Sequence, residues 1–168
     1  LITAARNGKK VTAVVELMAR FDEESNIKWS KRMQEEGVNV IFGVEGLKIH
    51  SKLLYIESKK GNIACVGTGN FHEGNAKTYT DYLMMTARPK IVNEVAKVFD
   101  FIDRPFSPFR FNELLVSPNS MKSRILRMID TEIKNASEGK EAWIKIKINH
   151  ITDTDMVQKL YQASKAGV

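Results

Sequence analysis

Apolar residues follow two different periods along the chain, and together these periods predict an α/β protein. Residues 11–17 (VTAVVEL) and 38–42 are short apolar runs rich in β-branched side chains, as in buried parallel strands. Between them, the acidic residues 22–24 suit a helix N-terminus and Gly37 suits a helix end, so residues 22–36 are predicted to be helical. This strand–helix–strand order is typical of a right-handed crossover unit in an α/β sheet.

The middle of the chain predicts further strands and one helix. Residues 52–57 and 63–66 read as two strands, joined by a turn at residues 59–62 (KKGN). An apolar run at residues 79–86 predicts another strand, and apolar residues at helical spacing predict a helix over residues 91–102.

A segment with two prolines, residues 104–108 (RPFSP), fits neither period and marks a predicted domain boundary. We therefore divide the chain into residues 1–104, a linker at residues 105–110, and residues 111–168. The second part predicts, in order, a short strand at 114–116, an amphipathic helix at 120–137, a half-exposed strand at 143–148 (WIKIKI) and a helix at 155–165.

The two ends of the chain resemble each other. Residues 1–8 (LITAARNG) align with residues 160–167 (LYQASKAG), each with leucine first and a basic residue two places before glycine. The match is short, and chance remains an alternative. If it is a repeat, the protein has two similar halves, and the second stops where its first buried strand should begin. We therefore expect a fragment.

Composition narrows the function classes only slightly. The chain has 168 residues, of which 43% are hydrophobic and 27% charged, and this composition argues against a disordered polypeptide. Its single cysteine, Cys65, excludes an internal disulfide and reads as a small buried apolar side chain. No apolar run approaches the roughly 20 residues that cross a bilayer. A net charge of +6 favours an anionic partner, and we expect a cytoplasmic protein, with peripheral membrane association left open.

The strongest chemical signal is the pair His50 and Lys52, followed by Gly67-Thr68-Gly69-Asn70. An imidazole can attack phosphorus to give a phosphoramidate, which divides one difficult transfer into two easier ones. A neighbouring lysine offsets phosphoryl charge and favours the neutral, nucleophilic imidazole. Glycines allow the backbone to approach a phosphate closely, and the Asn70 amide can donate a hydrogen bond.

This combination resembles the half-site of the phospholipase D superfamily, and its context is similar to bacterial polyphosphate kinases of the phosphohistidine type. The similar segments are residues 16–23 (ELMARFDE), 26–29, 46–52 (GLKIHSK), 67–71 (GTGNF), 79–82 (YTDY), 114–118 (LLVSP) and 147–149. The resemblance implies a phospholipase D-like mixed sheet flanked by helices, followed by an incomplete second repeat of the same fold.

The resemblance also implies reversible transfer of the terminal phosphate of ATP to polyphosphate, with Mg²⁺. It assigns the phosphorylated histidine to His50, with Lys52 and Asn70 in support. It places Arg20 against the transferred phosphates and their magnesium, and Tyr79 against the nucleotide. The full-length protein should assemble as a dimer or tetramer and should not bind nucleic acid. A second histidine and an arginine of the family's last domain, and nucleotide contacts from an N-terminal domain, lie outside this chain, so the fragment alone should be inactive.

Plainer interpretations stay open at each position. His50 could be a strand-end histidine with local hydrogen bonds, Arg20 could pair with Asp22 or Glu23, and Tyr79 could be a core aromatic. Lys52 and Asn70 could be purely structural. Two other functions also stay open: a phosphodiesterase or nuclease of the same superfamily, and a basic module that binds a polyanion without chemistry.

Overall fold

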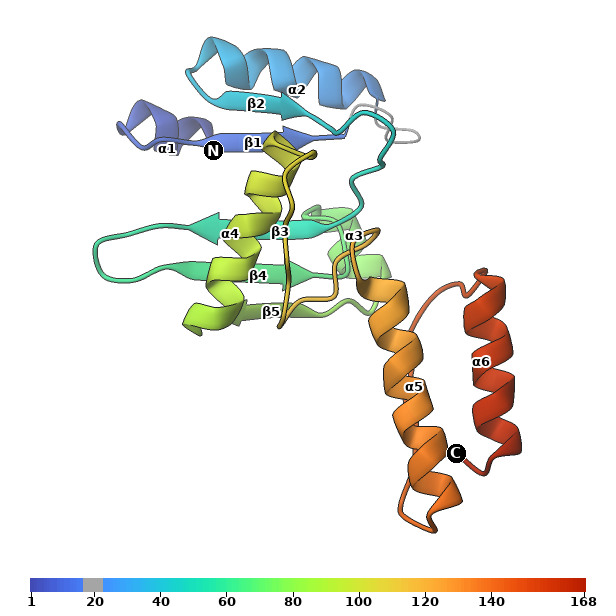
Figure 1. Ribbon diagram of the computed structural model, residues 1–168. Helices are drawn as coiled ribbons and strands as arrows, with labels where there is room; N and C mark the ends of the chain where they lie inside the picture. Colours follow the sequence, from blue (N-terminus) through green and yellow to red (C-terminus); the bar gives the residue numbers. More distant parts are fainter. Residues whose placement is uncertain (17–22) are drawn as a thin grey trace. The chain divides into compact units, whose positions relative to one another are not determined.

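The first part of the chain contains both helices and strands in a computed structural model that describes residues 1–16 and 23–168 (Figure 1). Two units are present, Leu1–Arg110 and Phe111–Val168. The elements are α1 (Ile2–Arg6), β1 (Thr12–Val15), α2 (Glu23–Glu35), β2 (Asn39–Phe42), β3 (Lys52–Ile56), β4 (Ile63–Gly67), α3 (Glu73–Thr78), β5 (Leu83–Thr86), α4 (Pro89–Asp103), α5 (Met121–Ser137) and α6 (Thr154–Lys165). Among the described residues, no helix combines the length and apolar character needed to span a membrane.

The predicted crossover unit is present at the start of the first unit. β1 and β2 pair in parallel, from Thr12 opposite Asn39 to Val15 opposite Phe42, and α2 connects them and packs on β2. Gly37 ends this helix with φ of +80°, a left-handed conformation that a residue with a Cβ rarely adopts.

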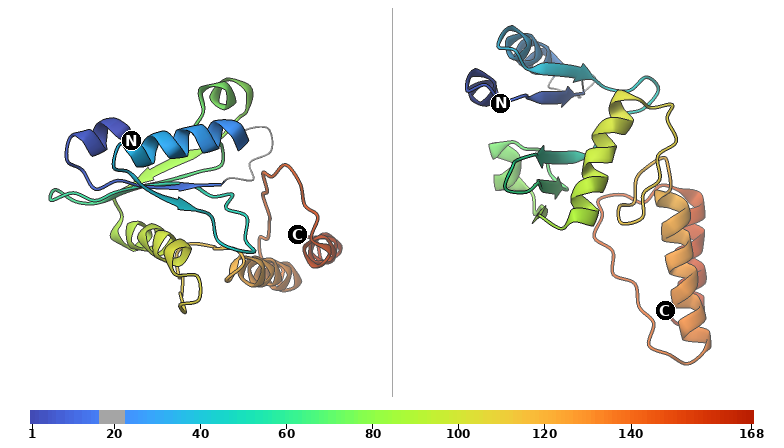
Figure 2. Two further views of the ribbon diagram at one scale, coloured as in Figure 1. Left: turned by 90° about the horizontal axis from the view of Figure 1, so that it is seen from above. Right: turned by 60° about the vertical axis from the view of Figure 1, so that its left-hand side comes forward.

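An antiparallel meander, β3–β4–β5, forms the second sheet of this unit, and α4 lies across it (Figure 2). Ala64 and Cys65 of β4 are buried, as are Val92 and Val95 of α4. The buried thiol of Cys65 is free, as the sequence predicted. Valine spacing along α4 therefore supplies one apolar face that covers the sheet.

Three features of the first unit differ from the sequence-based expectation. The strand expected at residues 79–86 is confined to Leu83–Thr86, because the preceding residues close α3 and form a loop. The short α3 itself was not predicted. Parallel and antiparallel pairs both occur, but the described strands form two separate hydrogen-bonded sheets rather than one mixed sheet.

In the second unit, α5 and α6 lie side by side and run in the same direction (Figure 1). The ammonium of Lys122, in the first turn of α5, lies 2.7 Å from carboxylate oxygens of both Asp153 and Asp155 at the start of α6. Ile129 and Ala163 are buried, one from each helix. The chain returns between the helices as the extended segment 143–148.

Two strands predicted in this unit are wrong. At residues 114–116, the Leu114 carbonyl accepts from the Arg124 guanidinium at 3.0 Å, and the Val116 carbonyl accepts from the Ser120 and Met121 amides in a turn. These carbonyls are therefore not available to a sheet ladder. Segment 143–148 is extended, but within the described residues of the unit no strand lies beside it, and alternation alone cannot form a ladder.

Candidate functional site

One edge of the β3–β4–β5 sheet brings together the segments that carry the predicted chemistry. In the antiparallel register Lys52 lies opposite Gly67, and Gly67 lies opposite Leu83. The start of β3, the end of β4 and the start of β5 therefore share this edge. As a result, residues 48–51, residues 68–70 and residues 79–82 all leave the sheet there.

His50 precedes β3 by two residues and is exposed. Its backbone is fixed on both sides: the Ile49 amide donates to Glu16 Oε2 at 3.0 Å, and Lys52 Nζ donates to the His50 carbonyl at 2.6 Å. Glu16 follows the end of β1, so this bond joins the histidine segment to the other sheet. The side chain of Asn26, in α2, donates to the Glu16 carbonyl at 2.9 Å.

The charge environment favours the neutral imidazole. The positive charge of Lys52, then partial burial and the charge of Lys48, lower the pKa of His50 below its ordinary value. Burial also lowers the pKa of Lys52, while the negative charge of Asp81 acts in the opposite direction. A neutral, accessible imidazole beside a lysine is able to act as a nucleophile toward phosphorus.

The loop after β4 is held by residues just before β5. Thr68 exchanges backbone and side-chain bonds with Tyr82: its amide donates to the Tyr82 carbonyl at 3.0 Å, and its hydroxyl accepts from the Tyr82 amide at 3.0 Å. That hydroxyl donates to Asp81 Oδ1 at 2.9 Å. Asn70 is exposed at the end of this loop, and its carbonyl accepts from the His72 amide at 2.7 Å.

Short helix α3 connects this loop to Tyr79. His72 caps the helix, with its Nδ1 accepting from the Gly74 amide at 3.1 Å. Tyr79 follows the last helical residue, and its amide donates to the Asn75 carbonyl. Its side chain is 64% exposed, so the interpretation of Tyr79 as a core aromatic is wrong. An exposed ring of this kind is available to a ligand.

Two further predictions concern the position of Arg20 and the binding of magnesium. Arg20 lies outside the described residues, so its pairing and its place near phosphate stay predictions. Among the described residues, no group of three or more histidine, cysteine or carboxylate side chains is arranged to hold a metal ion.

Sequence reasoning did not find the contacts of Glu16 and Asp81. Both residues lie in segments that the family resemblance singled out, but neither was assigned a role. Their contacts join residues 33 and 13 positions apart along the chain, which no local pattern could reveal.

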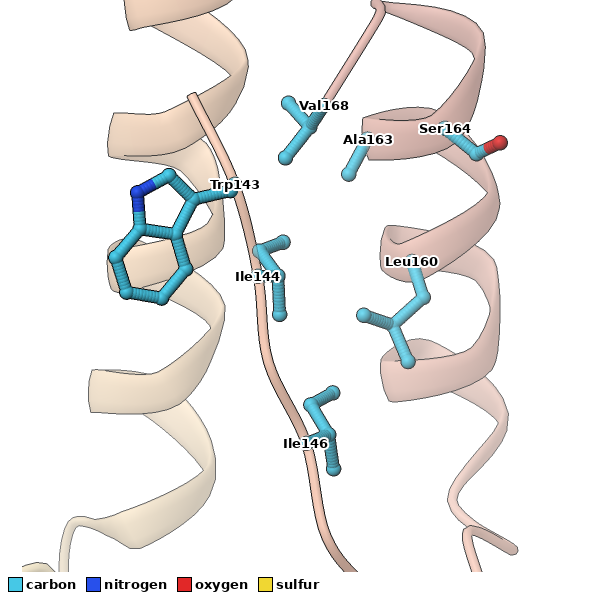
Figure 3. A pocket seen from close by; sticks show the side chains of 7 residues that line it. All are labelled: Trp143, Ile144, Ile146, Leu160, Ala163, Ser164 and Val168. Carbon is cyan, nitrogen blue, oxygen red and sulfur yellow. The ribbon is translucent and has the colours of Figure 1, made fainter. Parts of the chain in front are cut away.

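A cleft in the second unit carries no such chemistry. It has a volume of about 310 Å³ and lies between the extended segment and α6 (Figure 3). Trp143, Ile144 and Ile146 line one side, and Leu160 and Ala163 the other. Ser164 and Val168 complete a lining that is mostly apolar, and it contains no cationic side chain to bind a phosphate.

Removal of the Lys52 charge should change the pH dependence of His50. In Lys52→Met of the full-length protein, the pKa of His50 rises because its largest lowering influence is lost. If His50 is phosphorylated and Lys52 contacts the phosphate, as the family resemblance implies, the acid limb of the phosphorylation rate should move to higher pH. Its plateau should fall by roughly 10- to 100-fold. Rapid-quench rates between pH 5 and 9 measure both effects. Lys48→Met is the matched control and should move the limb less; an unmoved limb in Lys52→Met would contradict the assignment.

Comparison with known proteins identifies the family of the chain. The family model for polyphosphate kinase C-terminal domain 1 matches residues 1–108, and the model for C-terminal domain 2 matches residues 114–168. The polyphosphate kinase of Vibrio parahaemolyticus is 54% identical over 172 aligned positions, and that of Escherichia coli K12 is 50% identical. Both alignments cover all of this chain and 25% of the relative, so the chain spans about a quarter of their length.

The fold of the chain is similar to that of a solved structure. The crystal structure of polyphosphate kinase from Porphyromonas gingivalis superposes with a TM-score of 0.84 at 39% sequence identity. The superposition covers 99% of this chain and 29% of that protein. With both family models matched in order, this chain belongs to the polyphosphate kinase family.

Proposed function

We propose that this chain is the part of a polyphosphate kinase in which His50 accepts the terminal phosphate of ATP and passes it to polyphosphate. The observation that carries the proposal is the environment of His50: an exposed imidazole, favoured in its neutral form, beside Lys52 and at the sheet edge that presents Gly67-Thr68-Gly69-Asn70. A neutral ring nitrogen next to a cation suits in-line attack on a phosphoryl group.

The reaction divides into two balanced steps. In the first, a ring nitrogen of His50 forms a bond to the γ-phosphorus of ATP, the bond from that phosphorus to the bridging oxygen breaks, and ADP leaves. In the second, a terminal oxygen of polyphosphate attacks the same phosphorus, the nitrogen–phosphorus bond breaks, and the polymer is one unit longer. Both steps reverse. Mg²⁺ enters as part of the ATP substrate.

The other residues stabilise the transferred group. Lys52 and the Asn70 amide donate to phosphoryl oxygens, and a guanidinium at Arg20 can bind two of them at once. Tyr79 offers its exposed ring to the nucleotide. Within the family resemblance, a second histidine and an arginine from the last domain complete the site, so the isolated chain is inactive.

The wider assignment rests on the same resemblance. Residues 1–104 form the first phospholipase D-like half, and residues 111–168 the start of the second, joined by a linker. The full-length protein is a dimer or tetramer that uses ATP, ADP and polyphosphate in the cytoplasm. The net charge of +6 favours a polyanionic substrate and would support peripheral association with an anionic membrane.

Covalent labelling tests the proposal directly. The full-length protein is incubated with Mg²⁺ and ATP labelled in the γ-phosphate, and the label is tested for acid lability, alkali stability and position by peptide mapping. We expect label on His50 and none in a folded His50→Ala variant. No label on the folded wild-type protein would overturn the kinase assignment. Hydrolysis of a phosphodiester analogue would then favour the alternative function of a phosphodiesterase. Salt-dependent binding of a polyanion without turnover would favour the alternative of a non-catalytic binding module.

A further inference from the structure

His72 joins the loop that carries Asn70 to the short helix α3. Its amide donates to the Asn70 carbonyl at 2.7 Å, and its own carbonyl accepts from the Ala76 amide at 3.2 Å. Its imidazole caps the helix, because Nδ1 accepts from the Gly74 amide at 3.1 Å. One exposed histidine therefore connects the glycine loop with the first turn of the helix that leads to Tyr79.

The cap bond is possible for only one charge state of the ring. A ring nitrogen that accepts a hydrogen bond carries no proton, so the proton of the neutral ring lies on Nε2. In the protonated ring both nitrogens are donors, and Nδ1 would then face the Gly74 amide, which is also a donor. Protonation of His72 therefore breaks the cap. It also places a positive charge at the helix N-terminus, where the helix dipole disfavours a cation.

The helix that His72 caps depends on local bonds. α3 has six residues, and none of them is buried. Two further side-chain bonds lie within it: the Lys77 ammonium donates to the Glu73 carboxylate, and the Thr78 hydroxyl donates to the Gly74 carbonyl at 3.0 Å. A helix this short is marginal in water when tertiary packing does not support it. The cap should therefore supply a large share of its local stability.

Tyr79 is placed by the other end of the same helix. Its amide donates to the Asn75 carbonyl at 2.9 Å, and its side chain is 64% exposed. The last turn of α3 thus sets where the exposed ring lies. If the helix opens, the position of Tyr79 is no longer fixed.

The surrounding elements carry both acidic and basic groups. The charged and titratable groups of α3 and of the sheet edge beside it are Glu73, Lys77, Asp81, Lys52 and His50. Carboxylates and ammonium groups keep their charge between about pH 5 and pH 8, whereas histidine changes its charge in this range. His50 also titrates, but the charge of Lys52 lowers its pKa below the ordinary value.

We propose that His72 is a pH-sensitive cap that regulates nucleotide binding: the neutral ring holds α3 and presents Tyr79, and the protonated ring releases both. This inference rests on the proposed function, in which Tyr79 contacts the nucleotide. Affinity for ATP is full above the range in which His72 titrates and falls as the pH falls through it. Protonation of His50 instead lowers the rate of phosphoryl transfer, so the two histidines act on different steps.

Hydrogen exchange of the full-length protein tests the cap without the reaction. After correction for the intrinsic pH dependence of exchange, peptides covering residues 73–79 should exchange roughly 3- to 10-fold faster at about pH 5.5 than at about pH 8. Helix α6 is the internal control, because its cap is a carboxylate: Asp153 accepts from the Met156 amide at 3.0 Å. Its bond to Lys122 lowers the pKa of Asp153, so peptides covering residues 154–165 should not change.

Two variants separate the charge of the ring from the cap bond. In His72→Asn, the amide oxygen accepts from the Gly74 amide at any pH, so exchange of residues 73–79 should be slow at both pH values. In His72→Ala, the cap is absent, so exchange should be fast at both. Exchange in wild-type protein that does not change with pH would overturn the inference.

Nucleotide affinity tests the link between the cap and the site. The dissociation constant of a non-hydrolysable ATP analogue with Mg²⁺ is measured at both pH values in wild type and in His72→Asn. The rise at low pH should be roughly 3- to 10-fold larger in wild type, because α3 is less often in its binding-competent state. Titration of the nucleotide and of His50 affects both proteins equally and cancels in this comparison.

The outcomes distinguish this inference from the proposed function. An equal rise of the dissociation constant in wild type and in His72→Asn would overturn the regulation of binding by His72. If the wild-type protein binds no nucleotide at about pH 8 while exchange of residues 73–79 changes with pH, the proposed function fails and the pH-sensitive cap stands.

Discussion

Polyphosphate synthesis by the full-length protein is expected to fall by roughly 10³-fold or more when His50 is replaced by alanine, since the covalent intermediate cannot form. The imidazole is exposed, so its removal should not disturb the buried core. The loss should appear in kcat, with the KM for ATP changed little. Steady-state rates with purified full-length protein measure both constants.

Rescue by free imidazole tests whether the loss of activity in His50→Ala is due to the missing imidazole ring. Because position 50 is open to solvent, free imidazole can diffuse to the vacated place and should restore part of the turnover in His50→Ala. His150→Ala, a change of an exposed histidine in the second unit, is the matched control and should keep wild-type activity. Retention of more than about a tenth of the activity in His50→Ala would exclude a phosphohistidine at this position.

Replacement of Gly69 by alanine is expected to reduce activity by roughly 10- to 100-fold. The new methyl group would lie 2.0 Å from the Asp81 carboxylate, which can move away only by giving up its bond to Thr68. The Asn70 loop would then lose its anchor. Single-turnover labelling, with circular dichroism to verify the fold, measures the effect.

Gly67→Ala is the matched control for this change, since it adds the same methyl group within the same motif. Its nearest neighbour is Leu83 Cδ1 at 3.2 Å, the far end of a flexible side chain, so activity should fall only a few-fold. In the double variant Gly69→Ala with Asp81→Ala, the methyl group has room, and the rate should equal that of Asp81→Ala alone. A double variant slower than either single variant would show that the clash is not with Asp81.

Much of the fold could be predicted from the sequence where apolar period and turn residues agree. The β-branched runs became β1 and β2, Gly37 ended α2 as expected, and the hairpin of β3 and β4 turned at residues 59–62. The helices α4, α5 and α6 began and ended within two residues of their predicted bounds. In each case local propensity and tertiary packing favour the same structure.

Prediction was wrong where a local pattern and its surroundings disagree. Tyr79 and Thr80 have strand-forming side chains, yet Tyr79 closes α3, whose glycine and asparagine gave no helical period. Segment 143–148 alternates as a strand does, but a strand also needs a neighbour for its backbone. Alternation predicts which face of a strand is apolar, but it does not predict which strand would pair with it.

The candidate site was predictable in part for a related reason. His50, Lys52 and the glycine loop belong to motifs joined by one hairpin, so their proximity follows from local pairing. The hydrogen bonds that Glu16 accepts from Ile49 and that Asp81 accepts from Thr68 depend on tertiary contacts, which cannot be predicted from local sequence patterns. Arg20 lies outside the described residues, and its role stays a prediction.

The meander β3–β4–β5 also bears on how the site comes together during folding. His50, Lys52, Thr68 and Asp81 all come from one short stretch of chain, in which only the short helix α3 separates two of the three strands. The entropy cost of closing a loop grows with its length, so pairing of such neighbours is fast and needs few distant contacts. The bond from Glu16 to the Ile49 amide instead closes a loop of 33 residues. The candidate site can therefore assemble as a local unit, and docking of the β1 end then fixes the histidine segment within it.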